Sequence, residues 1–216
     1  QVVFLCGARD YHAMDWYRSA IKLFPKRKTL ILTDLIAGEG FKKLINNSDS
    51  VHRLLVLDRL LFTNQSRFGN YWRNLLKLLI FPIQVVLVKR FAKKYPHAIY
   101  YAHSMYYLWL ACAARVPYVG TPQGSDVLIK PYKSKLYKLA SKRSLRQAKA
   151  VTVDSSKMAK AVNEIAGVRA IIIQNGVDIA AICQQKIASS SDSVLRNLVV
   201  SMRAITPLYR IADIVR

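Results

Sequence analysis

Several residue types are scarce in this 216-residue sequence, and each shortage excludes a class of protein. Only eight glycines and seven prolines occur, without a fixed-period repeat, which excludes collagen-like and solenoid architectures. The three cysteines (Cys6, Cys112 and Cys183) are widely spaced and form no Cys-x-x-Cys pair, so we interpret them as buried thiols in a reducing compartment. The four histidines show no metal-ligand spacing, and the Asp-x-Asp motif does not occur. The sequence therefore predicts no metal site.

Acidic residues are also scarce, because 12 Asp and Glu stand against 34 Lys and Arg, for a formal net charge of +22. This surplus favours an anionic partner, which could be nucleic acid, a phosphate or an anionic membrane surface. Residues 67–94 hold seven basic residues and no acid, and residues 130–149 hold eight and no acid. Aromatic residues are interleaved in the first stretch. These patterns predict helices that lie on a membrane surface, with an ordinary solvated basic face as the alternative.

No apolar stretch is long enough to span a bilayer, since the longest candidate, residues 78–88, is short and contains Pro82. The first residues enter an apolar run directly, without the pattern of a signal peptide. We therefore expect a cytoplasmic protein that attaches peripherally to the inner face of the membrane. Because the sequence begins without Met and its last residues resemble an interrupted helix, we also expect it to be a piece of a longer protein.

Short apolar runs alternate with helical segments along most of the chain, and 52% of the residues are hydrophobic. This alternation predicts a Rossmann-like α/β fold, in which a parallel sheet carries helices on both faces. The expected strands are residues 2–6, 28–33, 54–57, 99–102, 117–121, 150–153 and 170–173. The expected helices are residues 14–24, 41–45, 69–95 with a break at Pro82, 105–115, 133–149 and 156–166.

Small polar residues near position 190 predict a linker between two domains. We expect residues 1–188 to form an N-terminal Rossmann-like domain and residues 189–196 to form the linker. Residues 197–216 would then begin a second domain, with an eighth strand at residues 197–202 and a helix after Pro207.

Two polar segments follow predicted strands, at the edge where parallel sheets bind ligands. Thr-Pro-Gln-Gly-Ser-Asp at residues 121–126 combines a glycine, which allows close backbone approach, with side chains that hydrogen-bond hydroxyl groups. Asn-Gly-Val-Asp at residues 175–178 is typical of a tight turn. Each segment by itself could also be an ordinary turn.

Together with the order of the elements, these segments give the chain a resemblance to the family 4 retaining glycosyltransferases of GT-B fold. In that family the fifth strand ends in a loop like Thr-x-His-Gly-x-Asp, which matches residues 121–126. The seventh strand ends in Asn-Gly-Val-Asp with an apolar residue four positions on, which matches residues 175–178 and Ile182. The first strand of the second domain ends in Gly-Arg, and here Met202 and Arg203 stand at that point.

The resemblance covers the order of elements over essentially the whole chain, with two departures from the family pattern. Gln123 replaces the usual histidine, which puts in doubt any role that needs an imidazole there. Leu208 stands at the position of the family's lysine, five residues after Arg203, so that only the arginine of the phosphate-binding pair is retained.

The resemblance implies the N-terminal, acceptor-side half of a GT-B enzyme that moves a sugar from a nucleotide-sugar donor to a polysaccharide or lipid-linked acceptor. It implies retention of anomeric configuration, no cofactor and no metal, and an inactive fragment if the donor-side half is missing. The residues that it places at the acceptor are Gly7, Asp10, Asp15, His103, Gln123, Gly124 and Asp126. Those that it places at the donor phosphates are Asn175, Gly176 and Arg203, whose planar guanidinium suits phosphate oxygens.

Other interpretations remain open for some of these residues and for the chain. Asp15 could cap a helix, and His103 could be a hydrogen-bonded structural histidine. The chain could instead be a basic α/β module that binds nucleic acid or membrane without catalysis. No common nucleic-acid-binding signature occurs, so we expect no nucleic-acid partner. The loop after the first strand lacks Gly-x-Gly-x-x-Gly, which argues against a dinucleotide-binding enzyme.

Overall fold

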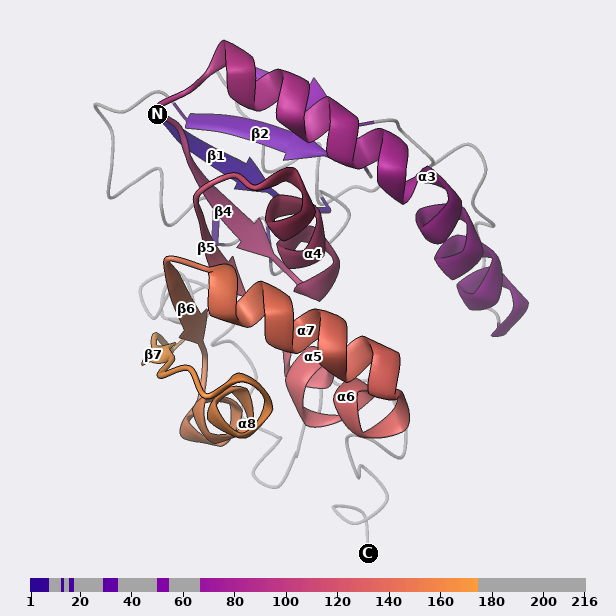
Figure 1. Cartoon of the computed structure of the whole chain (residues 1–216), viewed down its shortest axis with the longest axis vertical. Helices are drawn as coiled ribbons and strands as arrows, with labels where there is room; N and C mark the ends of the chain where they lie inside the picture. Colours follow the sequence, from indigo (N-terminus) through magenta and orange to yellow (C-terminus); the bar gives the residue numbers. More distant parts are fainter. Residues whose placement is uncertain (8–12, 14–15, 18–28, 35–49, 55–66, 175–216) are drawn as a thin grey trace, which may run out of the picture. The chain divides into compact units, whose positions relative to one another are not determined.

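The computed structural model describes residues 1–7, 13, 16–17, 29–34, 50–54 and 67–174 (Figure 1). The helix expected at residues 41–45 and most of the helix expected at residues 14–24 lie outside the described residues. The predicted linker and the predicted second-domain elements, at residues 189–216, lie outside them as well.

Seven parallel strands form one sheet, in the order β3-β2-β1-β4-β5-β6-β7. The strands are β1 (Val2–Leu5), β2 (Thr29–Thr33), β3 (Ser50–Arg53), β4 (Ile99–His103), β5 (Tyr118–Thr121), β6 (Ala150–Val153) and β7 (Ile171–Ile172). β1 lies in the middle, with Val2 paired to Thr29 of β2 and to Ile99 of β4. The order reverses at β1, because β2 and β3 lie on one side of it and β4 to β7 on the other. The predicted parallel α/β sheet is confirmed.

Six helices have described bounds: α3 (Arg67–Lys94), α4 (Met105–Ala114), α5 (Gly124–Leu128), α6 (Lys130–Lys133), α7 (Lys135–Gln147) and α8 (Ser156–Ala166). α8 shows why such a segment forms a helix where it does. The Ser155 side chain caps its start by accepting the Met158 N–H, and Gly167 ends it in the left-handed conformation at φ 67°. The bounds predicted for this helix are confirmed.

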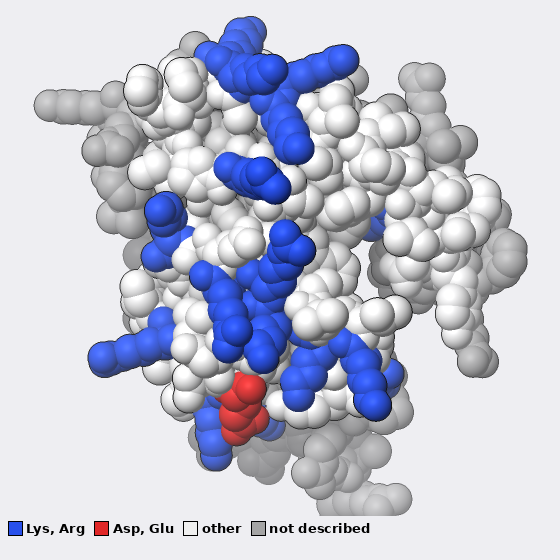
Figure 2. Space-filling model, in the orientation of Figure 1, with Lys and Arg blue, Asp and Glu red and all other residues white. Residues whose placement is uncertain are grey.

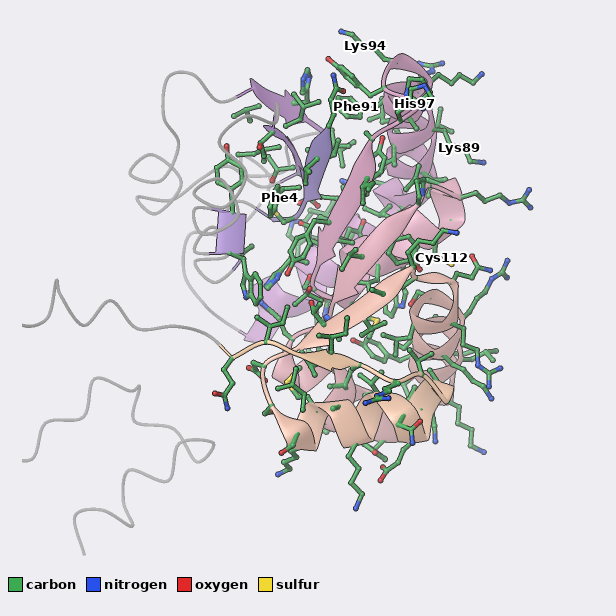
Figure 3. The ribbon with its side chains drawn as sticks, turned by 90° about the vertical axis from the view of Figure 1, so that its left-hand side faces the viewer. Phe4, Lys89, Phe91, Lys94, His97 and Cys112 are labelled. Carbon is green, nitrogen blue, oxygen red and sulfur yellow. The ribbon has the colours of Figure 1, made fainter. Side chains whose placement is uncertain are left out.

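The two faces of the sheet bury different side chains because successive residues of a strand point in opposite directions. Val3 and Leu5 of β1 pack in the larger hydrophobic cluster, which α3, α4, α7 and α8 cover. Phe4 packs on the other face against Tyr17, from a short described stretch of helix, with ring centroids 5.1 Å apart. Figure 3 shows Phe4 on one side of the sheet and Cys112 of α4 on the other. Helices on both faces, as predicted, are confirmed.

Pro82 does not interrupt α3, so the predicted break there is wrong. The helix continues from Arg67 to Lys94, with Pro82 inside it. A proline removes the hydrogen bond to the residue four positions earlier, which here is Leu78. Both residues are exposed, so water can hydrate the freed carbonyl group, and packing of the opposite side of α3 outweighs the local cost.

The third strand lies at residues 50–53 and not at the predicted 54–57. Its Ser-Val-His-Arg sequence is only weakly apolar, which an edge strand tolerates because a neighbour pairs with one side only. Leu54 follows the strand as a fully buried anchor, and its N–H donates to the carbonyl of Thr33 at 2.6 Å. The helix predicted at residues 133–149 is also divided, into α6 and α7, at Ser134.

Candidate functional site

A cleft of about 1840 Å³ lies over α4, with residues of α3 and α7 in its walls. We call it the α4 cleft. Its lining begins at the carboxyl ends of β1 and β4, with Gly7 and Ser104, and runs along α4 as far as Arg115. Both α3 and α7 pack against α4, which therefore forms the floor. Since parallel sheets bind ligands at the carboxyl ends of their strands, the end next to Gly7 and Ser104 is the candidate site, and we call it the inner end.

The buried carboxylate of Asp126 connects the elements around the inner end. One oxygen accepts the backbone N–H groups of Met105 at 2.9 Å and of Gln123 at 3.1 Å. The other accepts the Lys130 ammonium at 2.7 Å and the Tyr137 hydroxyl at 3.1 Å. An ionised carboxylate has about four acceptor positions, so this one is filled by the protein itself. The starts of α4 and α5 are thereby joined to α6 and α7.

Burial raises the pKa of Tyr137, and the charge of Asp126 raises it further. The phenol therefore stays protonated and acts as the donor to this carboxylate. The negative charge of Asp126 in the wall of the cleft is compensated, because Lys130 forms an ion pair with it.

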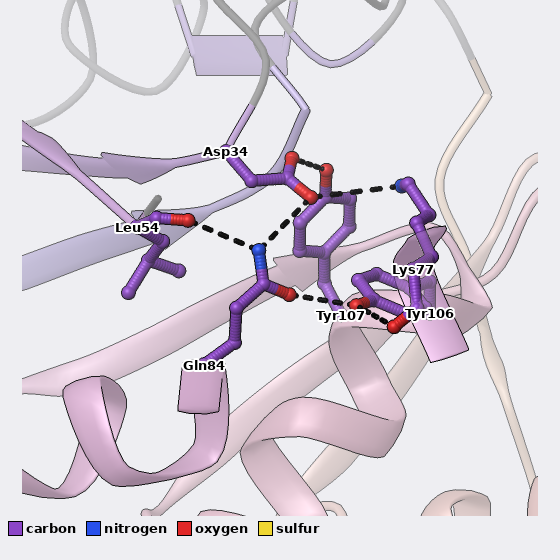
Figure 4. Close-up of polar contacts among 6 residues, drawn as sticks. All are labelled: Asp34, Leu54, Lys77, Gln84, Tyr106 and Tyr107. Carbon is purple, nitrogen blue, oxygen red and sulfur yellow. Dashed lines mark hydrogen bonds and ion pairs between the residues drawn. The ribbon is translucent and has the colours of Figure 1, made fainter. Parts of the chain in front are cut away.

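A second buried carboxylate, Asp34, follows β2 at the same edge of the sheet (Figure 4). It accepts a hydrogen bond from the Tyr107 hydroxyl at one oxygen and from Gln84 Nε2, at 3.4 Å, at the other. Lys77 Nζ lies 3.7 Å from the latter oxygen, and the Lys77 side chain is 17% exposed in the wall of the cleft. The partners of Asp34 thus come from α3, in a wall of the cleft, and from α4, its floor.

Tyr106 contacts Lys77 directly, and Gln84 in turn fixes Tyr106. The amide of Gln84 donates to the Leu54 carbonyl at 3.0 Å and accepts from the Tyr106 hydroxyl at 2.6 Å. The ring of Tyr106 lies under Lys77, with Nζ 4.2 Å from the ring centroid. A cation is therefore positioned at the inner end by a network that leaves it little freedom. It can interact with an anionic or hydroxyl-bearing ligand in the cleft.

Gly7 has a structural reason to be a glycine. A Cβ atom at this position would lie 2.7 Å from the hydroxyl oxygen of Tyr107. The missing side chain gives the Tyr107 phenol the room that it needs to reach Asp34. Burial, followed by the charge of Asp34, raises the pKa of Tyr107, so the phenol is held protonated as a donor.

Ser104, which joins β4 to α4, has a backbone conformation that side-chain-bearing residues rarely adopt, with φ 69° and ψ 152°. Its N–H donates to the Thr121 carbonyl at 2.9 Å, and its own carbonyl accepts the Tyr107 N–H at 3.1 Å. These two bonds tie the end of β4 to β5 and Ser104 to the first turn of α4, so Ser104 alone accommodates the change of direction between strand and helix. Such a conformation costs about 1–3 kcal/mol and often occurs at functional sites. The Ser104 hydroxyl makes no capping hydrogen bond to α4.

The structure brings some of the predicted acceptor residues together. Gly7, Gln123 and Asp126 line the α4 cleft, and Gly124 begins α5 next to them. A Cβ at Gly124 would meet nothing nearer than the Met158 sulfur, at 3.9 Å, so packing does not require a glycine there. His103 ends β4 but is 5% exposed and does not line the cleft. The predicted site residues Asp10, Asp15, Asn175, Gly176 and Arg203 lie outside the described residues.

Other residues at the inner end were not expected from the sequence. One of them, Asp34, directly follows a predicted strand, so the rule that ligands bind at strand ends could have singled it out. Lys77, Gln84 and Tyr106 carry no such signal, because they lie within helices and only packing brings them to the inner end. In the part of the chain that the structure describes, no three His, Cys, Asp or Glu side chains are grouped as metal ligands.

The face that bears the α4 cleft is basic. Residues 67–149 contain sixteen Lys and Arg and one acidic residue, the buried Asp126. Figure 2 shows basic side chains spread over this face, and Figure 3 shows Lys89 pointing away from the sheet. The outer side of α3 is also apolar, with exposed Leu75, Leu79, Ile83 and Val86 at helical spacing. None of the helices in the described ranges combines the length and apolar character that crossing a bilayer requires.

Comparison with known proteins finds one family model, described as Glycosyltransferase Family 4, which matches residues 62–181, more than half of the chain. No curated protein matches the chain. Among solved structures, Anabaena Alr3699/HepE in complex with UDP and glucose is similar, with 20% identity and a TM-score of 0.55, over 86% of this chain and 50% of that one.

Two further structures share the fold. UGT73P12 of Glycyrrhiza uralensis, complexed with glycyrrhetinic acid 3-O-monoglucuronide, has 12% identity and a TM-score of 0.53, over 80% of this chain and 48% of that one. A UDP-N-acetylglucosamine 2-epimerase from Rickettsia bellii has 10% identity and a TM-score of 0.50, over 88% of this chain and 49% of that one. The chain thus spans about half the length of the structures that it matches. At these identities the likeness shows the fold alone.

Proposed function

This chain belongs to Glycosyltransferase Family 4, and we propose that it supplies the acceptor-side half of an enzyme that transfers a sugar from a nucleotide-sugar donor. The observation that carries the proposal is the α4 cleft, whose inner end lies at the carboxyl ends of β1 and β4. The family match makes sugar transfer the reaction to expect there. The complex of HepE with UDP and glucose, which shares this fold, supports a nucleotide sugar as donor.

In this proposal the inner end binds the acceptor through hydrogen bonds. Ser104 and Gln123 line it and carry groups that can bond to sugar hydroxyls. Asp126 acts indirectly, by fixing the starts of α4 and α5. Gly124 lets an acceptor approach the backbone closely, and Asp10, Asp15 and His103 are kept as further candidates.

The donor side of the proposal rests on residues beyond the described ranges. Asn175, Gly176 and Arg203 would contact the donor phosphates, with the arginine neutralising the departing diphosphate. We propose that transfer retains the anomeric configuration and needs no cofactor.

We further propose that the acceptor is a polysaccharide or a lipid-linked glycan and that the protein, in the cytoplasm, attaches to the inner face of the membrane. The acid-poor face around the α4 cleft supports this, because anionic lipids attract each nearby Lys or Arg by about 1 kcal/mol. The exposed apolar side of α3 would enter the interface, and its basic last turns, including Lys89 and Lys93, would contact the lipid head groups.

Sugar transfer is tested with the complete natural protein that contains this chain. The protein is incubated with a panel of labelled nucleotide sugars and a membrane extract, and labelled lipid or polysaccharide product is measured. We expect product from one donor and a loss of at least about tenfold in the Gly124→Ala variant, whose fold we expect to be intact because its Cβ has room. Absence of product with every nucleotide sugar would refute the proposal.

Membrane attachment is tested by sedimentation with vesicles of phosphatidylcholine alone and with phosphatidylserine added. We expect binding to the anionic vesicles only, weakened by Lys89→Glu with Lys93→Glu. The matched control is Lys157→Glu with Lys160→Glu, the same charge change on exposed positions of α8. Equal binding of both double variants would contradict the assigned face. Salt-sensitive binding to DNA without vesicle binding would favour a nucleic-acid module instead.

A further inference from the structure

We infer that the acceptor is an acidic glycan, which lies along the α4 cleft with its negatively charged groups bound near Arg115. The inference rests on the proposed function, since it names the chemical class of the acceptor that would react at the inner end. We call the part of the cleft around Arg115 the outer end. The ten residues of α4, about 15 Å of helix, separate it from Ser104.

The outer end holds positive charge that the protein itself does not neutralise. The two lysines at the inner end are each paired with a buried carboxylate, so little of their charge is left for a ligand. Arg115 and Arg143 line the cleft as well, and neither forms an ion pair among the described residues. A smaller hollow of about 360 Å³ shares Arg115, Cys112 and Gln147 with the outer end and adds Lys149, with no acidic residue in its described lining. An anionic group would therefore be attracted to this end of the cleft.

Cys112, labelled in Figure 3, places Arg143 at the outer end. Burial raises the pKa of the Cys112 thiol, and the nearby charge of Arg143 partly offsets this effect. Arg115 follows Cys112 by about one helical turn, so both guanidinium groups belong to the same end of the cleft. The thiol donates to Gln147 Oε1 at 3.2 Å, which leaves the amide N–H₂ of Gln147 as a further donor.

The backbone of Arg115 gives independent support for a role of its side chain. Arg115 ends α4 in the left-handed conformation, with φ 58° and ψ 35°, and its N–H donates to the Cys112 carbonyl at 3.1 Å. Glycine is the usual residue at such a helix end, because a Cβ atom there costs about 1–2 kcal/mol. A glycine would end the helix at least as well, so we attribute the arginine to what its guanidinium binds.

The middle of the cleft offers the groups that bind sugars. Trp109 and Tyr137 line it as an edge-to-face pair, with ring centroids 4.9 Å apart, and each ring joins an apolar surface to a polar group. The buried indole N–H of Trp109 has no hydrogen-bond partner among the described residues, which often marks a place for a ligand or a water. Asn74 also lines the cleft, and its amide can donate and accept.

A chain of several sugars fits the size and the charge of the cleft. Its volume of about 1840 Å³ exceeds the range of about 300–1,000 Å³ that is typical of a site for one small ligand. The reacting residue would bind beside Ser104 and Gln123, and the residues behind it would run along α4. Carboxylate groups on them would accept paired N–H bonds from Arg115 and Arg143, whereas a neutral glycan would leave both arginines unused.

The probes are acidic tetrasaccharides, measured by calorimetry with the complete natural protein. Three backbones are used: galacturonate, alternating glucuronate and N-acetylglucosamine, and sialic acid. We expect saturable binding of at least one, and at least about tenfold weaker binding of neutral maltotetraose. Absence of binding by all three, or equal affinity for maltotetraose, would overturn the inference. Equal affinity for a DNA oligonucleotide would reduce the outer end to an unspecific polyanion surface and would overturn it as well.

Substitutions of the two arginines locate the bound glycan. We expect Arg143→Gln to weaken binding at least about tenfold. Arg90→Gln, the same change at an exposed position of α3 outside the lining, is the matched control and should bind as the wild type does. Unchanged affinity in both Arg143→Gln and Arg115→Gly would show that the glycan binds elsewhere and would overturn the inference.

Arg115→Gly separates binding from a merely structural role. Glycine suits the left-handed backbone, so we expect the thermal midpoint to stay equal or to rise while the affinity falls at least about tenfold. A cation at the end of a helix can also stabilise it through the helix dipole. A lower midpoint with unchanged affinity would mean that Arg115 serves only the end of α4, and the assignment of this arginine would be wrong.

Binding and transfer together distinguish this inference from the proposed function. If the wild-type protein transfers sugar but binds none of the acidic tetrasaccharides, the inference fails alone. If it binds one of them but transfers no sugar from any donor, the proposed function fails and a glycan-binding cleft remains.

Discussion

Replacement of Asp126 by alanine tests whether this carboxylate holds the inner end of the cleft together. The change leaves the buried Met105 N–H and the partly buried Gln123 N–H without acceptors, at about 1–3 kcal/mol each. The lost bond from Tyr137 adds about 1 kcal/mol. The ion pair with Lys130 adds little, because the Lys130 side chain is 50% exposed. We expect the free energy of unfolding to fall by about 3–7 kcal/mol.

Urea titration followed by circular dichroism measures this change, and a thermal midpoint lower by about 10–20 °C would accompany it. Asp126→Asn keeps one oxygen for the two N–H groups, so we expect it to cost about 1–2 kcal/mol. Asp154→Ala removes the same charge from an exposed position and is expected to stay within about 0.5 kcal/mol of the wild type. If Asp126→Ala costs no more than Asp154→Ala, the carboxylate does not have the structural role assigned to it.

Three further changes follow from the same structure. Ser104→Gly removes the strain of the positive φ at this position, so we expect the free energy of unfolding to rise by about 1 kcal/mol, net of the added flexibility of the unfolded chain. Ser104→Ala keeps the strain and should give no such gain. Equal urea midpoints for the two variants would show that the backbone at Ser104 is not strained. Gly7→Ala places a methyl group against the Tyr107 hydroxyl and is expected to cost about 1–3 kcal/mol in the same assay, and a neutral result would mean that Tyr107 moves freely. Burial raises the pKa of Tyr100 from 10.0 to about 12, so the unfolded chain loses this proton first. Stability should therefore be complete below pH 10 and fall as the pH rises towards 12, less so in Tyr100→Phe; a flat profile over that range would refute the assignment.

Much of the sheet could be predicted from local patterns. β1 and β6 are short apolar runs bounded by turn residues, and buried parallel strands are built from such runs. α8 has a capping serine at its start and a glycine after its end, so its bounds were predictable to the residue. The family model confirms the resemblance that the two strand-end motifs suggested. The predicted domain boundary and the roles of the site residues stay predictions.

Two of the errors share one physical cause, because they depend on the surroundings of a residue and not on its neighbours in sequence. Pro82 is tolerated in α3 because its side of the helix faces solvent. Residues 50–53 form a strand because β2 offers a free edge for pairing. The helix α5, which begins at Gly124 after β5, was missed for another reason: Asp126 accepts the N–H of Gln123, three residues earlier, and this local capping signal was not recognised.

By itself the sequence determined the alternation of strands and helices, and with it the parallel sheet and the position of its carboxyl edge, where sheets of this kind generally bind ligands. Those properties follow from hydrophobic periods and capping residues, which act over a few positions. Only the tertiary structure brought Asp34, Lys77 and Tyr107 together at the inner end, across up to 73 positions of sequence. No local pattern encodes such a network, because its bonds exist only after α3 and α4 have packed on the sheet.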